Sequence, residues 1–354
     1  MTALFNTELP KKFDSASAWK GADLATQPER WTQLLDSEQI TEIENAAHVF
    51  GKSGVAPEAI SPETFPLPRF GPVLVALRQE LQHGLGFSLI RGLPVDSLSM
   101  EQRCTIFCGI GSYLGSARSQ NARGHILGHV RDVGADLSDS NVRIYQTTKR
   151  QTFHTDSCDA VGLLCLKEAM EGGDSLLAAT LTLYNEMARL RPDLVPFLFE
   201  PIATDRRGEV PEGQLPYFMI PVLNWYKGNL TGLYQRTYIN SAKRFSDAPT
   251  PDPKHIEALD FLDELANDPD IHLRMRLQAG DIQFVYNHTN LHDRTAFRDY
   301  PEDNKRRHLL RLWLALPNDR ELPPVFQERY GKIEIGNRGG IVVEGTRLNV
   351  PLLP

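Results

Sequence analysis

Apolar residues recur along this 354-residue chain with two different periods, and each period predicts a different kind of element. Recurrence every three to four positions predicts helices at 31–47, 73–83, 100–114, 183–191 (capped by Thr182) and 253–266. Alternation, or a short apolar run between turn residues, predicts extended segments at 87–91, 143–156, 161–166, 176–181, 274–278, 282–286 and 307–316. The pattern therefore indicates a mostly β protein with flanking helices. The Gly-rich segment 115–134 interrupts it and is expected to be an irregular polar loop.

The strongest alternation lies in segment 307–316. One face carries Arg307, Leu309, Arg311 and Trp313, whereas the other carries His308 and three leucines. Arginines that alternate with large apolar residues do not fit a solvated edge strand. An arginine that points inward must meet an anion, because an unpaired buried charge is very costly.

The amino-acid composition and net charge limit the classes of protein to which this chain can belong. Hydrophobic residues make up 41% and charged residues 23% of the chain, which is typical of a soluble globular protein. The net charge of −7 and the pI near 5.8 argue against nucleic acid or an anionic membrane as a partner. The N-terminus lacks the pattern of a secretion signal and no apolar run is long enough to span a membrane, so we expect a cytoplasmic protein that acts on small molecules. The oligomeric state is open, a homo-oligomer included.

Cysteines and two loop histidines offer weaker signals. Four cysteines in a chain of this length do not indicate a disulfide framework, and Cys104 and Cys108 are expected to pack in a core. Cys158 is close enough in sequence to Asp156 to line a pocket. The spacing of His125 and His129 would suit a zinc helix, but flanking glycines favour ordinary loop histidines.

His154 and Asp156 lie two residues apart at the end of a predicted strand, so they would point to the same face. A His-x-Asp pair is a weak signal by itself. Two histidines and one carboxylate on one face of an iron atom form the facial triad of non-heme Fe(II) oxygenases, and an arginine near the third ligand would bind a cosubstrate carboxylate. Further histidines and arginines occur downstream, in segments 290–294 and 306–313.

Five short motifs occur in one order along the chain: His154-Thr-Asp156, Gly172-Gly-Asp-Ser175, Gly280-Asp281, Leu291-His-Asp-Arg294, and Arg306-Arg307 with Arg311. Together they resemble the taurine catabolism dioxygenase-like (TauD/TfdA) family of Fe(II)/2-oxoglutarate-dependent oxygenases. The segment 84–94 is also similar to an early strand of that family. The resemblance runs from about residue 84 to 316.

The resemblance implies a double-stranded β-helix, which is a distorted jelly roll of the clavaminate synthase type, with a helical insertion. The organisation expected is a single domain, 1–354. It consists of a helical lead-in at 1–83, a core at 84–316 with an insertion at about 183–275, and a C-terminal extension at 317–354.

The resemblance also implies the cofactors and their residues. His154, Asp156 and His292 would bind Fe(II) and form the catalytic centre. Arg307 would bind the distal carboxylate of 2-oxoglutarate as a bidentate fork. Ser175 stands where the family usually has threonine, and it is either a donor to the same carboxylate or a plain turn residue.

The implied reaction uses O2 and 2-oxoglutarate to oxidise a C–H bond of a small, anionic or amino-acid-like substrate, releasing succinate and CO2. Hydroxylation, desaturation and oxidative cyclisation are not separated by the sequence. Halogenation is not expected, because Asp156 fills the ligand position that a halide would need. The alternative is a non-catalytic jelly-roll protein that binds a metal or a carboxylate.

Substrate residues are less well specified. Arg311 would reach either the cosubstrate or an acidic group on the substrate. Tyr145, Gln120 and Asn287 are candidates for the substrate pocket. Arg294 is either an ion-pair partner or a functional residue.

Overall fold

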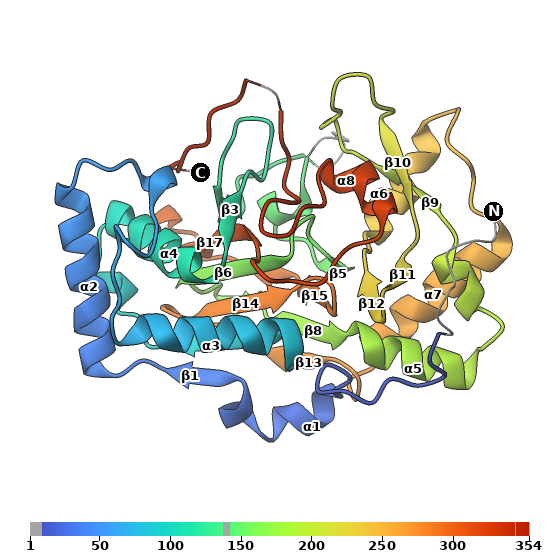
Figure 1. Ribbon diagram of the computed structural model, residues 1–354, viewed down its shortest axis with the longest axis horizontal. Helices are drawn as coiled ribbons and strands as arrows, with labels where there is room; N and C mark the ends of the chain where they lie inside the picture. The colour runs from blue at the N-terminus through green and yellow to red at the C-terminus, as the bar shows by residue number, and fades with distance from the viewer. Residues whose placement is uncertain (1–8, 137–141, 344, 354) are drawn as a thin grey trace.

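Two β-sheets face each other at the centre of the computed structural model, which describes residues 9–136, 142–343 and 345–353 (Figure 1). The expected lead-in and C-terminal extension therefore include residues 1–8, 344 and 354, which lie outside the described residues. The larger sheet has the order β1-β2-β14-β6-β17-β3, and β4 also pairs with β17. Its strands are β1 (Thr32–Leu34), β2 (Phe87–Arg91), β14 (Ile282–Tyr286), β6 (Ala160–Lys167), β17 (His308–Ala315), β3 (Ser116–Arg118) and β4 (Leu127–Val130).

The smaller sheet has the order β13-β8-β15-β5, and all its pairings are antiparallel. Its strands are β13 (Leu273–Met275), β8 (Ser175–Ala179), β15 (Asn290–Arg294) and β5 (Gln151–His154). Three two-stranded ribbons lie outside these sheets: β9 (Ile202–Asp205) with β10 (Tyr217–Ile220), β11 (Leu223–Tyr226) with β12 (Asn229–Gly232), and β7 (Glu171–Gly172) with β16 (Phe297–Arg298).

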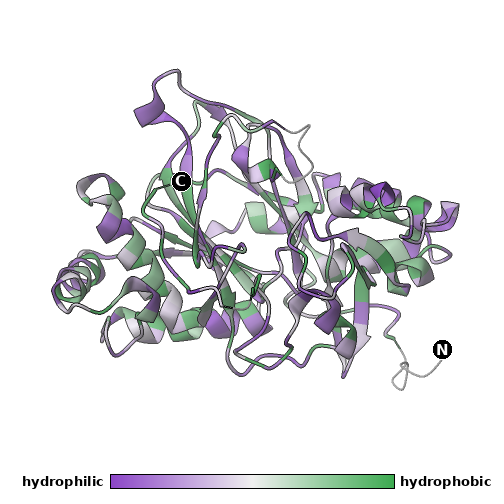
Figure 2. Ribbon diagram, turned by 90° about the horizontal axis from the view of Figure 1, so that it is seen from above, coloured by the Kyte–Doolittle hydropathy of each residue, from purple (hydrophilic) through white to green (hydrophobic). Residues whose placement is uncertain are grey.

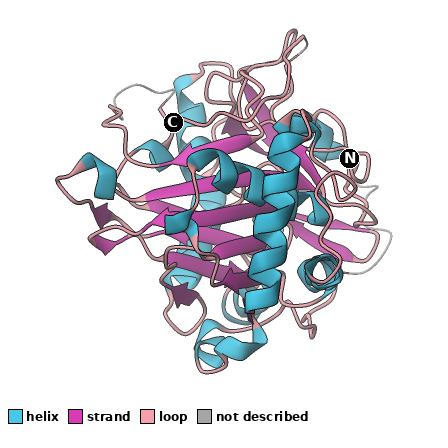
Figure 3. Cartoon of the chain, turned by 90° about the vertical axis from the view of Figure 1, so that its left-hand side faces the viewer, coloured by secondary structure: helices cyan, strands magenta, loops and turns pink. Residues whose placement is uncertain are grey.

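Helices cover the outer faces of both sheets. Those with α geometry are α1 (Gly21–Ala25), α2 (Ser37–Lys52), α3 (Phe70–His83), α4 (Met100–Leu114), α5 (Thr180–Leu190), α6 (Arg236–Ser241), α7 (Pro253–Asn267) and α8 (Gln327–Tyr330). Short 3₁₀ turns are η1 (Pro28–Arg30), η2 (Pro57–Ala59), η3 (Val95–Ser97), η4 (Ile144–Gln146), η5 (Val195–Phe199), η6 (Ala242–Arg244), η7 (Asp303–Lys305) and η8 (Pro324–Phe326). Figure 3 shows helices in front of the strands on the side where α2 lies.

Alternating side chains build one core between the sheets and one on each outer face. On β17, Leu310 and Leu312 pack toward α2, α3 and α4, while Leu309 and Trp313 point to the space between the sheets. The smaller sheet alternates in the same way, so that Leu177 faces inward and residues such as Leu291 face α5 and α7. Figure 2 shows the apolar strands at the centre and helices that alternate between polar and apolar residues. The predicted two-faced pattern of segment 307–316 is confirmed.

Several predicted elements match the structure. The helices predicted at 73–83, 100–114 and 253–266 correspond to α3, α4 and α7. The strands predicted at 87–91, 161–166 and 282–286 correspond to β2, β6 and β14. These segments combine a strong period with clear end signals, such as the capping box of Ser99 and Gln102 at the start of α4.

The predicted helix at 31–47 is wrong in its first part. Residues Thr32–Leu34 form β1, which pairs in parallel with β2. The helix begins after Asp36, whose side chain accepts hydrogen bonds from two backbone N–H groups, while the Gln39 side chain accepts the N–H of Asp36. This reciprocal capping box sets the helix start. Helix α5 likewise begins at Thr180, three residues earlier than expected, and Thr182 donates to the carbonyl of Trp19 instead of capping it.

Two segments near the site also differ from expectation. Segment 115–134 is not wholly irregular, because β3 and β4 form within it and pair with β17. Pairing to a long buried strand outweighs the polar, Gly-rich composition. Segment 143–156 was expected to be extended, but η4 forms first and β5 starts only at Gln151. The result is a jelly-roll-like core of facing sheets. Within the described ranges, no helix is long and apolar enough to cross a membrane.

Candidate metal centre and adjoining cavities

Three potential metal ligands meet at one end of the smaller sheet. His154 ends β5, and His292 lies directly opposite it on β15. Directly paired residues of adjacent strands project to the same face. Asp156 follows two residues after the end of β5, in the turn that leads to β6. The turn, rather than the strand pleat assumed from the sequence, therefore brings the carboxylate to the histidines.

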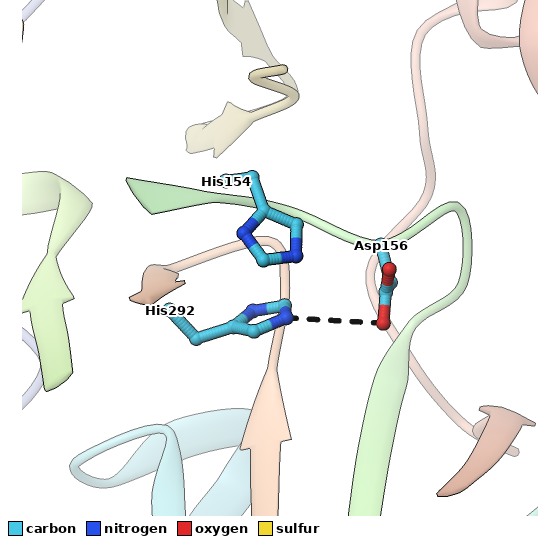
Figure 4. Close-up of side chains that lie close together, drawn as sticks. All are labelled: His154, Asp156 and His292. Carbon is cyan, nitrogen blue, oxygen red and sulfur yellow. Dashed lines mark ion pairs between the residues drawn. The ribbon is translucent and has the colours of Figure 1, made fainter. Parts of the chain in front are cut away.

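The three side chains are close enough to share one ion. The imidazole rings lie 4.1 Å apart between centroids, and Nε2 of His292 is 3.8 Å from Oδ2 of Asp156 (Figure 4). One ligand atom from each residue lies within 4.8 Å of the other two. All three side chains are buried. This is a set of two nitrogens and one oxygen, the donor set of non-heme iron sites.

Hydrogen bonds orient His154 as a ligand. Nδ1 of His154 lies 2.8 Å from the carbonyl of Thr152, which can only accept, so Nδ1 carries the proton. Nε2 therefore has a free lone pair, which here accepts the amide of Gln151 at 2.8 Å. Burial lowers the pKa of both histidines; for His292, whose pKa falls to about 3, the charge of His154 adds to the effect. Both imidazoles are neutral at pH 7, which is the metal-binding form.

Asp156 is held ionised by its neighbours. Its Oδ2 accepts a 2.8 Å hydrogen bond from Nε1 of Trp313 and lies 3.7 Å from Nη1 of Arg311. Burial alone would raise the pKa of Asp156, but Arg311, the two histidines and Trp313 bring that pKa below its ordinary value. Its backbone N–H donates to Oδ1 of Asn287 at 2.9 Å. The carboxylate is thus fixed in position and in charge.

A cavity between the two sheets, named here the inner cavity, opens onto this centre. It has about 510 Å³ of empty space, part of it open to solvent. Its wall combines apolar residues with charged ones: Val130, Val161, Leu163, Leu277, Leu309, Ser175, Asp293, Arg294, Arg307 and Arg311. The three candidate ligands also line it, together with Tyr145 and Gln151. The space suits a small, elongated molecule with an anionic end.

Arg307 is the clearest anion-binding group in the inner cavity. It is buried, its Nη1 has no hydrogen-bond partner, and its Nη2 reaches only the carbonyl of Gly173 at 3.4 Å. Gly173 has φ +75°, and a Cβ there would lie 2.9 Å from Nε of Arg307, so glycine makes room for the guanidinium. Burial lowers the pKa of Arg307. An anion in the cavity would relieve this uncompensated charge.

Arg294 lies close to Arg307 but is used structurally. Its guanidinium donates to the carbonyls of Thr147 and Lys149. Both guanidinium groups flank the ring of Phe297, with centroid distances of 4.7 Å for Arg294 and 5.1 Å for Arg307. Burial and the positive charge of Arg307 lower the pKa of Arg294 to about 9. Among the described residues Arg294 forms no ion pair, and its observed contacts hold the backbone before β5.

The other predicted site residues divide into two groups. Ser175, Arg311 and Tyr145 line the inner cavity, and the Arg311 guanidinium stacks 4.6 Å from the Tyr145 ring. Ser175 Oγ donates to Oε1 of Gln283 at 3.0 Å. Gln120 lines neither cavity described here, because its side chain accepts from Nε of Arg311 at 2.7 Å and donates to two carbonyls. It positions Arg311.

Asn287 is also a positioning residue in the structure. Its amide accepts from the N–H of Asp156 and donates to the carbonyl of Cys158, which fixes the turn after β5. Cys158 likewise does not line either cavity; it is buried, and its Sγ lies 3.3 Å from the carbonyl of Ala160. Cys104 and Cys108 pack in the outer core as expected.

His125 and His129 do not form a metal site with other described residues, and His129 lies on β4 rather than in a loop. His129 bonds through Nδ1 to Nε2 of His308 at 2.8 Å, and its other nitrogen lies 3.0 Å from the carbonyl of Pro351. His125 lies in a bridge to Asn349 instead. Neither belongs to a group of three metal-binding side chains among the described residues.

A second cavity, named here the outer cavity, adjoins two of the candidate ligands, His154 and Asp156, and has about 520 Å³ of empty space, part of it open to solvent. It shares Tyr145, Gln151, His154, Asp156 and Arg311 with the inner cavity. The rest of its wall comes from η4, α6, α8 and the ends of strands: Arg143, Ile144, Thr152, Ser157, Gln235, Arg236, Thr237, Tyr238, Trp313 and Arg329. A molecule in it would touch the centre without filling the inner cavity.

The segment after residue 316 clamps the turn that carries Asp156. Arg338 donates to Asp159 at 2.7 Å and to Asp319 at 2.8 Å, and all three side chains are buried. The N–H of Gly340 donates to the carbonyl of Ser157 at 2.7 Å. Asp159, His288 and Asp319 form a second group with metal-ligand chemistry, but the Arg338 guanidinium already bridges the two carboxylates, so a cation lies between them.

Sequence analysis missed three residues of the centre. Trp313 was placed on the inward face but not linked to Asp156, although its spacing from Arg311 put both on that face. Gln151 could have been noticed three residues before His154. Arg329 carries no sequence signal, because only folding of the C-terminal segment brings it to Ser157.

Comparison with known proteins agrees with this geometry. The model of the family described as "Taurine catabolism dioxygenase TauD, TfdA family" matches residues 52–313. The chain is 30% identical over 319 residues to FR-33289 synthase of Streptomyces rubellomurinus, covering 89% of this chain and 94% of that protein. It is 33% identical over 318 residues to the taurine hydroxylase-like protein SAT17 of Stachybotrys chartarum, covering 87% and 81% of the two chains.

A solved structure supports the fold. The crystal structure of asparagine oxygenase with Fe(II), 2S,3S-3-hydroxyasparagine and succinate has a TM-score of 0.63 and 19% sequence identity, covering 80% of this chain and 93% of that one.

Proposed function

The chain belongs to the taurine catabolism dioxygenase TauD, TfdA family, and we propose that it oxidises a C–H bond of a small, anionic or amino-acid-like molecule. It is a non-heme iron oxygenase that depends on 2-oxoglutarate. The observation that carries the proposal is the cluster of His154, Asp156 and His292, which lines the inner cavity and of which His154 and Asp156 also line the outer cavity. One cavity can hold the cosubstrate while the other admits the molecule to be oxidised.

The proposed iron ligands are His154, Asp156 and His292. Their chemistry fits Fe(II), because the protonated Nδ1 of His154 leaves Nε2 as a donor and Asp156 is held as a carboxylate. These residues would hold Fe(II), which would supply the oxidation of the C–H bond with O2 as the oxidant, while 2-oxoglutarate is converted to succinate and CO2. The protein's task is to bind and orient the reactants.

The proposed cosubstrate site is the inner cavity. Arg307 would bind the distal carboxylate of 2-oxoglutarate through its unpartnered Nη1, and the Ser175 hydroxyl lines the same cavity. Arg311 lies beside Asp156, so it would meet the end of the cosubstrate nearest the iron. The orphaned, buried donor of Arg307 is the feature that favours an anion there.

The proposed substrate site is the outer cavity. Tyr145 and Arg311 lie where the two cavities meet, so they would separate substrate from cosubstrate. Hydroxylation is the default outcome, and desaturation and oxidative cyclisation start from the same substrate radical. Among relatives, the asparagine oxygenase structure contains a hydroxylated amino acid, which supports an amino-acid-like substrate.

We further propose that the jelly-roll-like core is a double-stranded β-helix. A single domain would form it, with the metal centre at one mouth. What supports it is the position of the centre at the end of two facing sheets. The segment from α5 through α7 packs on the outer face of the smaller sheet, in agreement with an insertion.

A spectroscopic titration tests the proposal. Anaerobic addition of Fe(II) and 2-oxoglutarate to the protein should produce a weak visible metal-to-ligand charge-transfer band. His154→Ala should abolish the band, whereas His125→Ala, in the loop bridged to Asn349, should leave it intact. A band of equal intensity in His154→Ala would refute the metal assignment.

Turnover separates an enzyme from the alternative, a binding protein. Mass spectrometry of a panel of amino, sulfonic and carboxylic acids should detect products heavier by one oxygen or lighter by two hydrogens, with matching succinate. Absence of any succinate release across the panel would favour a non-catalytic protein that binds a metal or a carboxylate.

A further inference from the structure

The outer cavity contains four arginines, of which three are already neutralised. Each of these three has a carboxylate partner: Arg143 with Glu209, Arg236 with Asp260 and Asp263, and Arg311 with Asp156. Arg329 is the fourth, and it forms no ion pair within the described part of the chain. Arg329 is therefore the one arginine of this wall without an ion pair among the described residues; Glu209, which pairs with Arg143, acts on it only through its charge.

The contacts of Arg329 leave the two terminal nitrogens of its guanidinium available to bind a ligand. It lies in α8, its Nε donates to Oγ of Ser157 at 2.7 Å, and its guanidinium packs 5.5 Å from the centroid of the Phe218 ring. The two terminal nitrogens make no hydrogen bond to the described residues. Burial lowers the pKa of Arg329, but a guanidinium remains charged at neutral pH. A partly buried, unpaired cation of this kind is stabilised by an anionic ligand.

We propose that Arg329 binds an oxyanion group of the substrate, so that the substrate class is small organic acids whose acidic end lies away from the oxidised carbon. The inference rests on the proposed function, because it names what the outer cavity takes. A guanidinium binds carboxylate, sulfonate and phosphonate groups alike through two parallel hydrogen bonds. Arg329 lies beyond residues 52–313, so the family match does not include it.

The position of Arg329 gives this contact a role in orientation. Ser157, which holds the guanidinium, directly follows Asp156, the proposed carboxylate ligand. A substrate anchored on Arg329 therefore lies beside the metal centre, and its chain length sets which C–H bond reaches the centre. Fixing one end of a flexible molecule in this way favours reaction at a single carbon.

The test uses a matched series of ligands that differ only in their acidic group. β-Alanine, 2-aminoethanesulfonate and 2-aminoethylphosphonate are titrated calorimetrically into the full-length protein, anaerobically, with Fe(II) and 2-oxoglutarate; ethanolamine is the probe without an oxyanion. We expect at least one acid to bind about ten-fold or more tightly than ethanolamine, and Arg329→Gln to remove that preference. The acid with the highest affinity identifies the oxyanion.

Two controls keep the result specific. Ser157→Ala removes the hydrogen bond to Arg329 but keeps the guanidinium, so it should retain most of the preference for acids. Arg329→Gln should keep the charge-transfer band with 2-oxoglutarate. A wild-type protein that shows the band but does not prefer any acid, or an Arg329→Gln variant that prefers acids as the wild type does, would overturn the proposal. Absence of the band in the wild type would count against the proposed function instead, and the acid titration can then be read on the metal-free protein.

Discussion

Nε1 of Trp313 donates a 2.8 Å hydrogen bond to Oδ2 of Asp156, the oxygen that also lies 3.8 Å from Nε2 of His292. The indole therefore fixes the carboxylate oxygen nearest to the candidate ligand on β15. Trp313 is buried between the two sheets, so its ring cannot turn away without opening the core. Asp156 lies in a turn, and this contact ties the turn to the long strand β17.

Removing that donor should weaken metal binding. Trp313→Phe keeps an aromatic ring in the core but leaves Asp156 without its N–H donor, so Fe(II) affinity should fall about ten-fold. Anaerobic metal titration measures the change. Trp31→Phe, which removes an indole donor to the carbonyl of Leu24 far from the centre, should leave the affinity unaltered. Equal affinities in wild type and Trp313→Phe would show that the hydrogen bond does not tune the site.

Arg307 is expected to set the requirement for 2-oxoglutarate. Arg307→Met removes the unpartnered guanidinium of the inner cavity, so the concentration of 2-oxoglutarate needed for half-maximal succinate release should rise roughly 100-fold. Arg298→Met, on the exposed β16, is the matched control, since Arg298 pairs with Glu171 at the surface. An unchanged requirement would transfer the carboxylate-binding role to Arg311.

The clamp formed by the C-terminal segment is expected to stabilise the fold. Arg338→Met would leave Asp159 and Asp319 buried without their shared cation, and the free energy of unfolding should fall by about 3 kcal/mol. Urea denaturation measures this loss. Arg347→Met changes an exposed arginine of the same segment and should alter the free energy by less than about 0.5 kcal/mol. A loss as small in Arg338→Met would mean that the buried network adds no stability.

His308 should make the protein less stable in mild acid. Burial, then the charges of His129, Arg131, Lys167 and Arg103, lower the pKa of His308 to about 3. An unfolded histidine takes up its proton near pH 6.5, so the unfolded state binds more protons than the folded state between these two pH values. Stability from the neutral form is therefore present above pH 6.5 and is lost as the pH falls toward about 3.

The size of this effect follows from the pKa difference. Between pH 7 and pH 5, His308 should account for about 2 kcal/mol of the decrease in the free energy of unfolding. Urea denaturation at several pH values should thus show a shallower decrease in His308→Gln than in the wild type. His83→Gln, at the exposed end of α3, is the matched substitution away from the hydrogen-bonded pair of His129 and His308. Parallel curves for wild type and His308→Gln would contradict the assignment.

The sequence by itself determined the local elements with strong periods and the chemistry of the centre. The alternation of segment 307–316 is enough to place Arg307, Arg311 and Trp313 on one face, because neighbouring strand residues must point to opposite sides. The order of short motifs identified the family, which the match to residues 52–313 shows. These are properties of nearby residues or of ordered motifs, so they can be read without knowing the packing.

Only the tertiary structure decided which residues far apart in the chain form hydrogen bonds with each other. Gln120 and Asn287 were expected to face a substrate, but their amides are committed to Arg311 and to the turn around Asp156. Segment 127–130 forms strand β4 because it pairs with the neighbouring strand β17. Arg329 reaches the outer cavity only because the C-terminal segment folds back onto Ser157. Such contacts join residues far apart in the chain, and their partners depend on packing geometry that no local pattern encodes.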